Sequence, residues 1–176
     1  NGHYLRVLLP LYGSMDTSEL SIEIVPELEG MEMPVGGQTV AFDIVRARAA
    51  NIGHEVFLLR CPDLFHGEMM YGGYDEHVRF ALLSRAAIEM CQRQRFAPDI
   101  FHVHDWHTAM VPVYLKSVYG WDTLFKKTKT VLTIHNLAHQ EIHPPAEAAT
   151  LGLPASLAAY PGLLEYHGAL NLLKAG

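Results

Sequence analysis

The sequence has little cysteine, no excess of positive charge and no long apolar run. Cys61 and Cys91 are the two cysteines among 176 residues, and without CxxC spacing they indicate neither a disulfide framework nor a zinc knuckle. Thirteen basic residues against 19 acidic ones give a formal charge of -6, which argues against nucleic acid as a partner. No apolar run approaches the roughly 20 residues that span a bilayer. We therefore expect a soluble protein in a reducing, cytoplasm-like compartment, without a membrane partner.

The composition suits one globular domain, and the two ends look cut. Hydrophobic residues make up 49% of the chain and charged residues 18%, which is enough to build a core. The chain begins at Asn1 without Met, just before an apolar run, and it stops at Gly176 inside a helix-like pattern. We expect residues 1–176 to be a single domain that is truncated at both ends.

Apolar runs predict a series of strands. Strands are expected at 4–9, 55–59, 100–104 and 130–134. The run 4–9 is short and nearly continuously apolar, which predicts an interior strand, and 100–104 is expected to be a buried strand. Two further extended runs, 20–25 and 38–45, are separated by glycines and prolines. They predict an antiparallel excursion.

Helices alternate with these strands. One should begin after Asp75, with a core-facing stripe of Phe80, Leu83, Ala87 and Met90 and with arginines mostly elsewhere. A second should begin at a cap formed by Asp105, bend at Pro112 and run towards residue 120, and a last one should begin near residue 163. Residues 62–74 should form a loop. The alternation predicts an α/β fold: a Rossmann-like, mostly parallel sheet flanked by helices.

Two polar clusters follow neighbouring strands. His104, Asp105 and His107 come after one strand, and His135 and Asn136 come after the next. Ligands of open α/β sheets bind beyond the carboxyl ends of the strands. If the two strands are neighbours in the sheet, both clusters line one cleft.

A metal site is one interpretation of the first cluster. The residues His102, His104, Asp105 and His107 read H-x-H-D-x-H, whereas the strongest metallo-hydrolase string is H-x-H-x-D-H. His102 and His104 point the same way along a strand, but Asp105 and His107 belong to a helix start and no other cluster offers clear ligands. The sequence therefore favours no metal site.

Two other interpretations remain for this cluster. In the structural one, Asp105 only caps its helix, His102 and His104 are satisfied core histidines, and Trp106 fills a gap. In the sugar-binding one, carboxylate, imidazole and amide groups bond paired hydroxyls beside an aromatic wall, and Asp105, His135, Asn136 and Trp106 supply these groups.

Five motifs occur in order along nearly the whole chain: Arg6–Pro10, Arg79–Leu83, Pro98–His107, Thr133–Gln140 and Leu170–Gly176. In these motifs the chain resembles bacterial glycogen synthases and plant starch synthases. This family has the GT-B architecture of two Rossmann-like domains facing across a cleft. The resemblance implies that the chain is most of the N-terminal, acceptor-side domain without its first strand, from a bacterial cytoplasm or, in a plant, the plastid stroma.

The resemblance also implies roles for particular residues. Asp105 and His135 would be catalytic residues at the sugar end of the cleft. Asn136, His104 and the aromatic Tyr71 would join them in binding substrate. The implied reaction is retaining glucosyl transfer from a sugar nucleotide, ADP-glucose by expectation, to the non-reducing end of an α-1,4-glucan, with no cofactor and no metal.

Two departures from the family concern the loop after His135. The family usually has an aromatic where His139 stands and a glycine where Glu141 stands. A glutamate resists the positive φ that glycine allows, so we expect a reshaped loop.

The missing parts of the family pattern affect activity and association. The phosphate-binding loop and the second domain are absent from this sequence, so we expect the chain alone to be inactive. An exposed sheet edge left by a missing strand could pair with another copy. A non-catalytic glucan-binding module is the alternative function, and a metal-dependent hydrolase is a weaker one.

Overall fold

The chain folds into two compact units. A computed structural model describes residues 2–50, 52–67, 71 and 73–176. Unit 1 comprises residues 1–33 and 40–73, and unit 2 comprises residues 34–39 and 74–176. In the described part, no helix is both long and apolar enough to cross a membrane.

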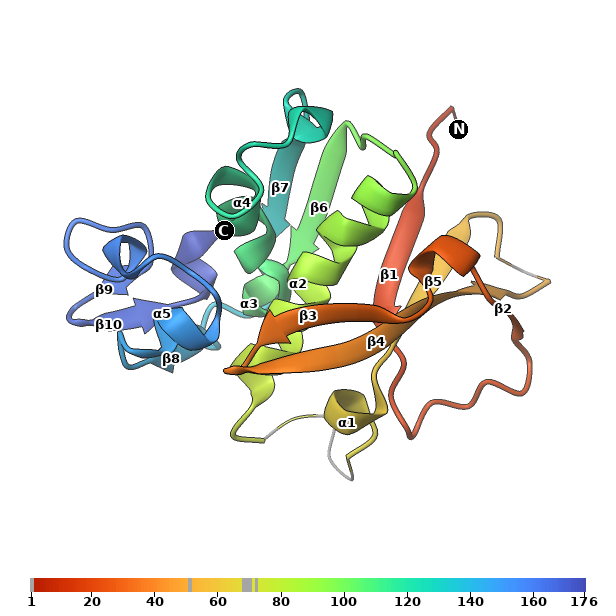
Figure 1. Ribbon diagram of the computed structural model, residues 1–176, viewed down its shortest axis with the longest axis horizontal. Helices are drawn as coiled ribbons and strands as arrows, with labels where there is room; N and C mark the ends of the chain where they lie inside the picture. Colours follow the sequence, from red (N-terminus) through yellow and green to blue (C-terminus); the bar gives the residue numbers. More distant parts are fainter. Residues whose placement is uncertain (1, 51, 68–70, 72) are drawn as a thin grey trace. The chain divides into compact units, whose positions relative to one another are not determined.

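Unit 1 is built on a mixed five-stranded sheet (Figure 1). Its strands are β1 (Arg6–Pro10), β2 (Ser21–Glu23), β3 (Met31–Val35), β4 (Gln38–Arg48) and β5 (Glu55–Arg60). Strand β1 runs parallel to β5, whereas β4 runs antiparallel to both β5 and β2, and β3 also pairs with β4. The predicted antiparallel excursion is confirmed. Strand β1 lies at one end of the strand order.

Short helices and an apolar cluster complete unit 1. A 3-10 turn, η1 (Pro26–Leu28), and a helix, α1 (Pro62–Phe65), both begin with a proline, whose fixed φ and missing N–H suit a first helical position. Helix α1 occupies the start of the predicted 62–74 loop, and residues 68–70 and 72 of that loop lie outside the described residues. The sheet buries Val45, Ala47, Val56 and Leu58 against Leu11, Met15 and Leu20.

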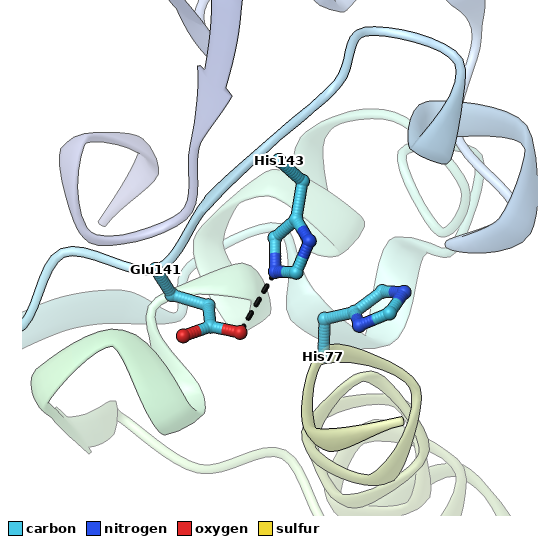
Figure 2. Close-up of side chains that lie close together, drawn as sticks. All are labelled: His77, Glu141 and His143. Atoms are coloured by element: carbon cyan, nitrogen blue, oxygen red, sulfur yellow. Dashed lines mark hydrogen bonds and ion pairs between the residues drawn. The ribbon is translucent and has the colours of Figure 1, made fainter. Parts of the chain in front are cut away.

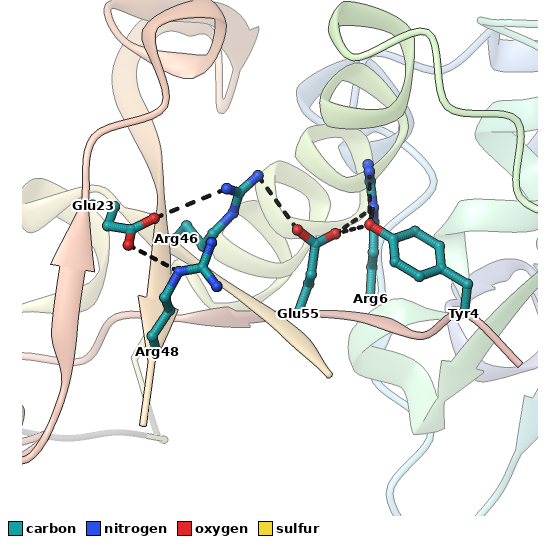
Figure 3. Close-up of polar contacts among 6 residues, drawn as sticks. All are labelled: Tyr4, Arg6, Glu23, Arg46, Arg48 and Glu55. Carbon is teal, nitrogen blue, oxygen red and sulfur yellow. Dashed lines mark hydrogen bonds and ion pairs between the residues drawn. The ribbon is translucent and has the colours of Figure 1, made fainter. Parts of the chain in front are cut away.

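A row of charged side chains, called here the charge ladder, crosses four strands of this sheet (Figure 3). It consists of Arg6, Glu23, Arg46, Arg48 and Glu55, with Tyr4 at one end. The nitrogen-to-oxygen distances are 3.1 Å for Arg6–Glu55, 3.4 Å for Arg46–Glu55, 3.9 Å for Arg46–Glu23 and 2.8 Å for Arg48–Glu23. The Tyr4 hydroxyl also donates to Glu55. Opposite charges on neighbouring strands stabilise a sheet.

Unit 2 contains a long helix and a parallel pair of strands. Helix α2 (Glu76–Arg93) precedes β6 (Ile100–His104), which pairs with β7 (Lys129–Thr133). Between the two strands lie the helices α3 (Asp105–Thr108) and α4 (Met110–Lys116) and the turn η2 (Thr123–Phe125). This is the predicted strand–helix–strand crossover.

Helix α2 begins directly after Asp75, as predicted, but its burial is wider than the predicted stripe. Arg79 and Arg85 are only 4% and 8% exposed, although the helical pattern placed arginines away from the core. The Arg85 guanidinium donates to the carbonyl oxygen of Pro34 at 2.6 Å and lies over the ring of Tyr114. A buried cation with such partners is held in place rather than solvated.

The helix after β6 breaks earlier than predicted. The bend was expected at Pro112, and instead the helix divides at Ala109 into α3 and α4. Proline lacks the N–H that would bond the carbonyl four residues before it, at Thr108, and its ring crowds that carbonyl. Proline therefore sits in the first turn of a new helix, which ends at Lys116.

The C-terminal part of unit 2 is irregular. It contains β8 (Ile142–His143), α5 (Glu147–Thr150), η3 (Ala155–Leu157), β9 (Glu165–Tyr166), β10 (Ala169–Asn171) and η4 (Leu173–Ala175). The helix predicted from residue 163 is wrong, because β9 and β10 form a hairpin there. Its two turn residues, His167 and Gly168, have φ of 49° and 83°. Positive φ at both central residues is the geometry of a tight hairpin turn.

The tip of the β3–β4 hairpin belongs to unit 2. Gly36 and Gly37 have φ of 65° and 74°, which again suits a two-residue hairpin turn. A side chain at Gly36 would lie 2.8 Å from Val78, so glycine is also required by the close approach of α2. The Gly36 N–H donates to the carbonyl of Thr150 at 2.9 Å.

Candidate functional site at the ends of β6 and β7

The carboxyl ends of β6 and β7 lie level with each other. The parallel register pairs Ile100 with Lys129 and His104 with Thr133. Asp105, just after β6, and His135, just after β7, therefore lie at the same edge of the sheet. The prediction that the two polar clusters meet at one sheet edge is confirmed for Asp105, His104, His135 and Asn136.

Asp105 binds the backbone of the second cluster. Its Oδ1 accepts hydrogen bonds from the N–H of His135 at 2.7 Å and from the N–H of Asn136 at 3.3 Å. It makes no side-chain capping bond to α3, whose N-cap residue is His104. The prediction that Asp105 caps its own helix is therefore wrong: the carboxylate closes the start of the loop after β7.

The backbone and the charge state of Asp105 fit this role. Its φ of 51° is left-handed, a conformation that aspartate tolerates better than most residues and that often marks functional sites. Burial alone would raise the pKa of Asp105, but the two backbone N–H groups, with His135 and His107, outweigh it and lower the pKa. The carboxylate is therefore charged at neutral pH.

Three imidazole rings form a row beside Asp105. His102 Nε2 lies 2.7 Å from the Thr133 hydroxyl, and the rings of His102 and His104 are 4.4 Å apart. His104 Nδ1 lies 3.0 Å from His135 Nε2, with the two rings stacked. Such a contact needs one nitrogen to donate and the other to accept. All three residues are exposed, so the interpretation of His102 and His104 as core histidines is wrong.

The row has consequences for protonation. Burial lowers the pKa of His104, and the neighbouring His102 and His135 lower it further, against the opposing effect of Asp105. A neutral His104 can share the single proton of its contact with His135. Among the residues that the structure describes, the second ring nitrogen of His135 has no hydrogen-bond partner.

Of the side chains next to this row, Trp106 and His107 pack against Phe80, and Asn136 shapes the loop after β7. Trp106 is buried and meets the Phe80 ring edge-on at 5.1 Å, so it fills the core as the structural interpretation predicted. His107 stacks on Trp106 and also contacts Phe80. Asn136 Oδ1 accepts from the N–H of Ala138 at 3.0 Å, so its oxygen shapes the loop.

The remaining sequence predictions fall away from this cluster. Tyr71 is exposed and belongs to unit 1, so its role at the donor stays a prediction. Glu141 has a φ of 52°, so this glutamate does adopt the left-handed conformation that it was expected to resist.

Sequence reasoning missed one group in the loop beyond the cluster. Among the described residues, the group of three potential metal ligands is His77, Glu141 and His143, and the string His102, His104, Asp105, His107 forms none. The missed group joins residues about 65 positions apart, and its one sequence signal was the glutamate in place of the family's glycine.

Comparisons with known proteins agree with this architecture. The sequence model of the family described as starch synthase catalytic domain matches residues 1–176. The chain is 34% identical over 98% of its length to "Glycogen synthase" of Geotalea daltonii, and 36% identical over 99% to "Glycogen synthase 1" of Geobacter sulfurreducens. It spans about a third, 36%, of the length of each of these relatives.

A solved structure extends the likeness to the fold. The catalytic domain of Starch Synthase IV from Arabidopsis thaliana, bound to ADP and acarbose, superposes with a TM-score of 0.85 at 25% identity, over 99% of this chain and 36% of that one. The fold is thus that of the N-terminal domain of a GT-B glycosyltransferase. The chain belongs to the starch synthase catalytic domain family, whose members named above are glycogen and starch synthases.

Proposed function

We propose that this chain is the acceptor-side domain of a glucosyltransferase that moves glucose from ADP-glucose to the non-reducing end of an α-1,4-glucan, with retention of configuration. The observation that carries the proposal is the bond from Asp105 Oδ1 to the backbone of His135 and Asn136 at the strand ends. It fixes a carboxylate and an imidazole at the place where α/β sheets bind ligands. The names of the relatives and the ADP and acarbose in the solved structure support the substrate class.

Asp105 has a free oxygen for a sugar. Oδ1 holds the loop, and among the described residues Oδ2 takes no hydrogen bond. A charged carboxylate oxygen accepts from a sugar hydroxyl more strongly than a neutral acceptor does. In the proposed site, Asp105 therefore keeps the loop closed and binds a hydroxyl with the same group.

His135 and His104 act as a pair in the proposed site. Their contact at 3.0 Å orients the His135 ring, and the nitrogen of His135 that faces away from His104 would contact the donor glucose. Asn136 would bind substrate through its amide nitrogen, because its oxygen is used in the loop. The role of Tyr71, which belongs to unit 1, stays a prediction from the sequence.

The leaving diphosphate needs positive charge that this cluster does not hold. The proposed site, His104, Asp105, His135 and Asn136, contributes no lysine or arginine side chain. Fixed positive charge near a leaving phosphate is a large part of such catalysis. A second GT-B domain would supply it, so we expect residues 1–176 alone to be inactive. No cofactor or metal enters the proposed transfer.

The proposed setting follows from the same comparisons. The curated relatives named above are bacterial, which favours a bacterial cytoplasm over a plastid. In the described part of unit 1, no strand pairs with the outer side of β1. We expect that edge to accept a further strand, and a second copy could supply one.

A chimera tests the proposal. Residues 1–176 would replace the matching third of "Glycogen synthase 1" of Geobacter sulfurreducens, and glucan elongation from ADP-glucose and from UDP-glucose would be measured. We expect elongation with ADP-glucose and its loss on Asp105→Ala. A folded chimera without activity, beside an active parent, would overturn the proposal. Binding of maltooligosaccharides to the isolated chain together with an inactive chimera would support a binding module instead.

A further inference from the structure

The strongest unassigned feature of unit 2 is the group of His77, Glu141 and His143 (Figure 2). His77 lies in the first turn of α2, and His143 ends β8, two residues after Glu141. One ligand atom from each lies within 4.8 Å of the other two. None of the three belongs to the proposed sugar site, so the inference does not depend on the proposed function.

We propose that His77 Nδ1, an imidazole nitrogen of His143 and the Glu141 carboxylate bind a divalent transition-metal ion of the zinc class. Two imidazoles and one carboxylate are a ligand set that such ions prefer. Glu147 accepts from His77 Nε2 and orients its ring.

The spacing suits a small ion. Zinc binds histidine nitrogen and carboxylate oxygen at about 2.0–2.2 Å, so two ligands of a tetrahedral ion lie about 3.3 Å apart. The distance from His143 Nε2 to Glu141 Oε1 is 2.7 Å, and every ligand atom is within 4.8 Å of the others. Side-chain adjustments of about 1 Å would therefore bring the three atoms into contact with one ion.

One ring nitrogen is buried and unsatisfied. His77 is 8% exposed, and in the described part of the chain its Nδ1 has no hydrogen-bond partner. Leaving a buried polar atom unpaired costs about 1–3 kcal/mol. In Figure 2 the His77 ring lies beside that of His143, with one nitrogen on the side of Glu141. A bound ion would give Nδ1 the partner that it lacks.

The position of Glu147 indicates which nitrogen of His77 would bind the ion. Its Oε2 lies 3.3 Å from His77 Nε2, so Nε2 carries the proton and the lone pair is on Nδ1. Carboxylates that orient a ligating histidine through its other nitrogen are a common part of metal sites. Here that carboxylate comes from α5, a third element of the chain.

The backbone at Glu141 is consistent with a functional constraint. A φ of 52° is uncommon for glutamate, and glycine, which has no Cβ, would fit that conformation with less strain. The strain persists with the side chain bonded to His143. Binding an ion would link α2 to the segment that follows the His135 loop.

Zinc titration of the chain tests the proposal. The protein would be stripped with a chelator, dialysed and titrated with Zn²⁺ by calorimetry, and we expect one ion per chain. X-ray absorption of the zinc-loaded protein should show nitrogen and oxygen neighbours at about 2.0–2.1 Å and no sulfur. Absence of binding to the unmodified chain would overturn the proposal.

Variants separate this site from the other histidines. His143→Ala and Glu141→Gln should each weaken zinc binding about 100-fold or more, and Glu147→Gln about 10-fold. His135→Ala, in the other histidine cluster, and His54→Ala, an exposed histidine of unit 1, should leave the affinity unchanged. Unaltered binding in both His143→Ala and Glu141→Gln would overturn the proposal.

A further variant separates binding from folding. Glu141→Gly removes the ligand and also relieves the positive φ. We expect the apo protein to be at least as stable as the unmodified chain in urea unfolding, and zinc to cause no further stabilisation. A Glu141→Gly protein that zinc stabilises as much as it stabilises the unmodified chain would contradict the proposal.

Discussion

The charged groups of the two units are arranged in opposite ways. In unit 1, the charge ladder pairs each glutamate with arginines on neighbouring strands (Figure 3). In unit 2, backbone N–H groups bond Oδ1 of the Asp105 carboxylate, beside a row of histidines, and no described residue bonds its Oδ2. Charges that neutralise each other stabilise a sheet, whereas a carboxylate held by backbone groups still has charge to offer a ligand. The contrast predicts which changes affect stability and which affect activity.

The largest expected effect separates activity from stability at Asp105. In an active chimera, Asp105→Ala should lower glucan elongation about 100-fold to 1000-fold, in the range seen when a charge-stabilising group is removed. Asp105→Asn keeps an oxygen for the backbone N–H of His135 and should lose less. Elongation rates at saturating glucan would be compared, with Glu32→Gln, an exposed strand glutamate of unit 1, as the control. Equal rates in Asp105→Ala and Glu32→Gln would contradict the contrast.

The second effect concerns the centre of the charge ladder. Glu55→Gln should lower the free energy of unfolding by about 1–2 kcal/mol, because Arg6, Arg46 and Tyr4 lose a charged acceptor. The change would be measured by urea unfolding at pH 7 beside Glu32→Gln, for which we expect no change.

The same substitution makes a pH prediction. Burial alone would raise the pKa of Glu55, but Tyr4, Arg6 and Arg46 lower it below its usual value. Its contribution to stability is therefore present above the unfolded-state pKa of about 4.3 and is lost as the pH falls through the lower folded-state pKa. The stability difference between the unmodified protein and Glu55→Gln should shrink on acidification, and a difference that grows would contradict this.

A smaller effect is expected at His104. Its pKa is lowered in the folded state, so near pH 6.5 the unfolded chain binds more protons and stability rises with pH. His104→Gln should remove this rise. The rise itself should be less than about 0.5 kcal/mol, because the ring is exposed. Unfolding free energies of both proteins at pH 5.5 and 7.5 give the difference. An identical pH dependence in the two would count against the His104–His135 pair.

The smallest effect is at the outer end of the charge ladder. The Glu23–Arg48 pair is about half exposed, and exposed pairs are worth about 0.2–1 kcal/mol. A double-mutant cycle with Glu23→Gln and Arg48→Gln should give a coupling in this range that declines between 0.1 M and 1 M salt, as the screening length falls from about 10 Å to about 3 Å. A coupling that does not change with salt would show that the pair is not electrostatic.

The sequence predicted the parts of the fold that have a strong periodic pattern. The strands at 100–104 and 130–134 and the helix after Asp75 appear close to their predicted limits as β6, β7 and α2. Their register then explains why His135 lies near Asp105. The segment from residue 163, wrongly predicted as a helix, is as apolar as the elements predicted correctly. Its pattern did not reveal the His167–Gly168 turn, because a glycine within an apolar segment is compatible with a helix or with a hairpin.

Side-chain partners were harder to predict than elements. Aspartate is a favoured N-cap residue, which is why Asp105 was predicted to cap the next helix. Instead, Asp105 has a left-handed φ and bonds another loop. The group of His77, Glu141 and His143 could not be found by local spacing, because His77 lies on a different element from the other two. Such groups depend on tertiary packing, which no short motif encodes.

The tip of the β3–β4 hairpin determines where the chain can be cut. Residues 34–39 are part of unit 2 and are fixed there by bonds from Arg85 to Pro34 and from Gly36 to Thr150. A segment starting at residue 74 would therefore lack a piece of its own core, and Arg85 would lose the acceptor that lets it stay buried. A protease that nicks the chain near residue 73 should leave the two products associated, and neither unit can be expressed from one contiguous stretch of the gene.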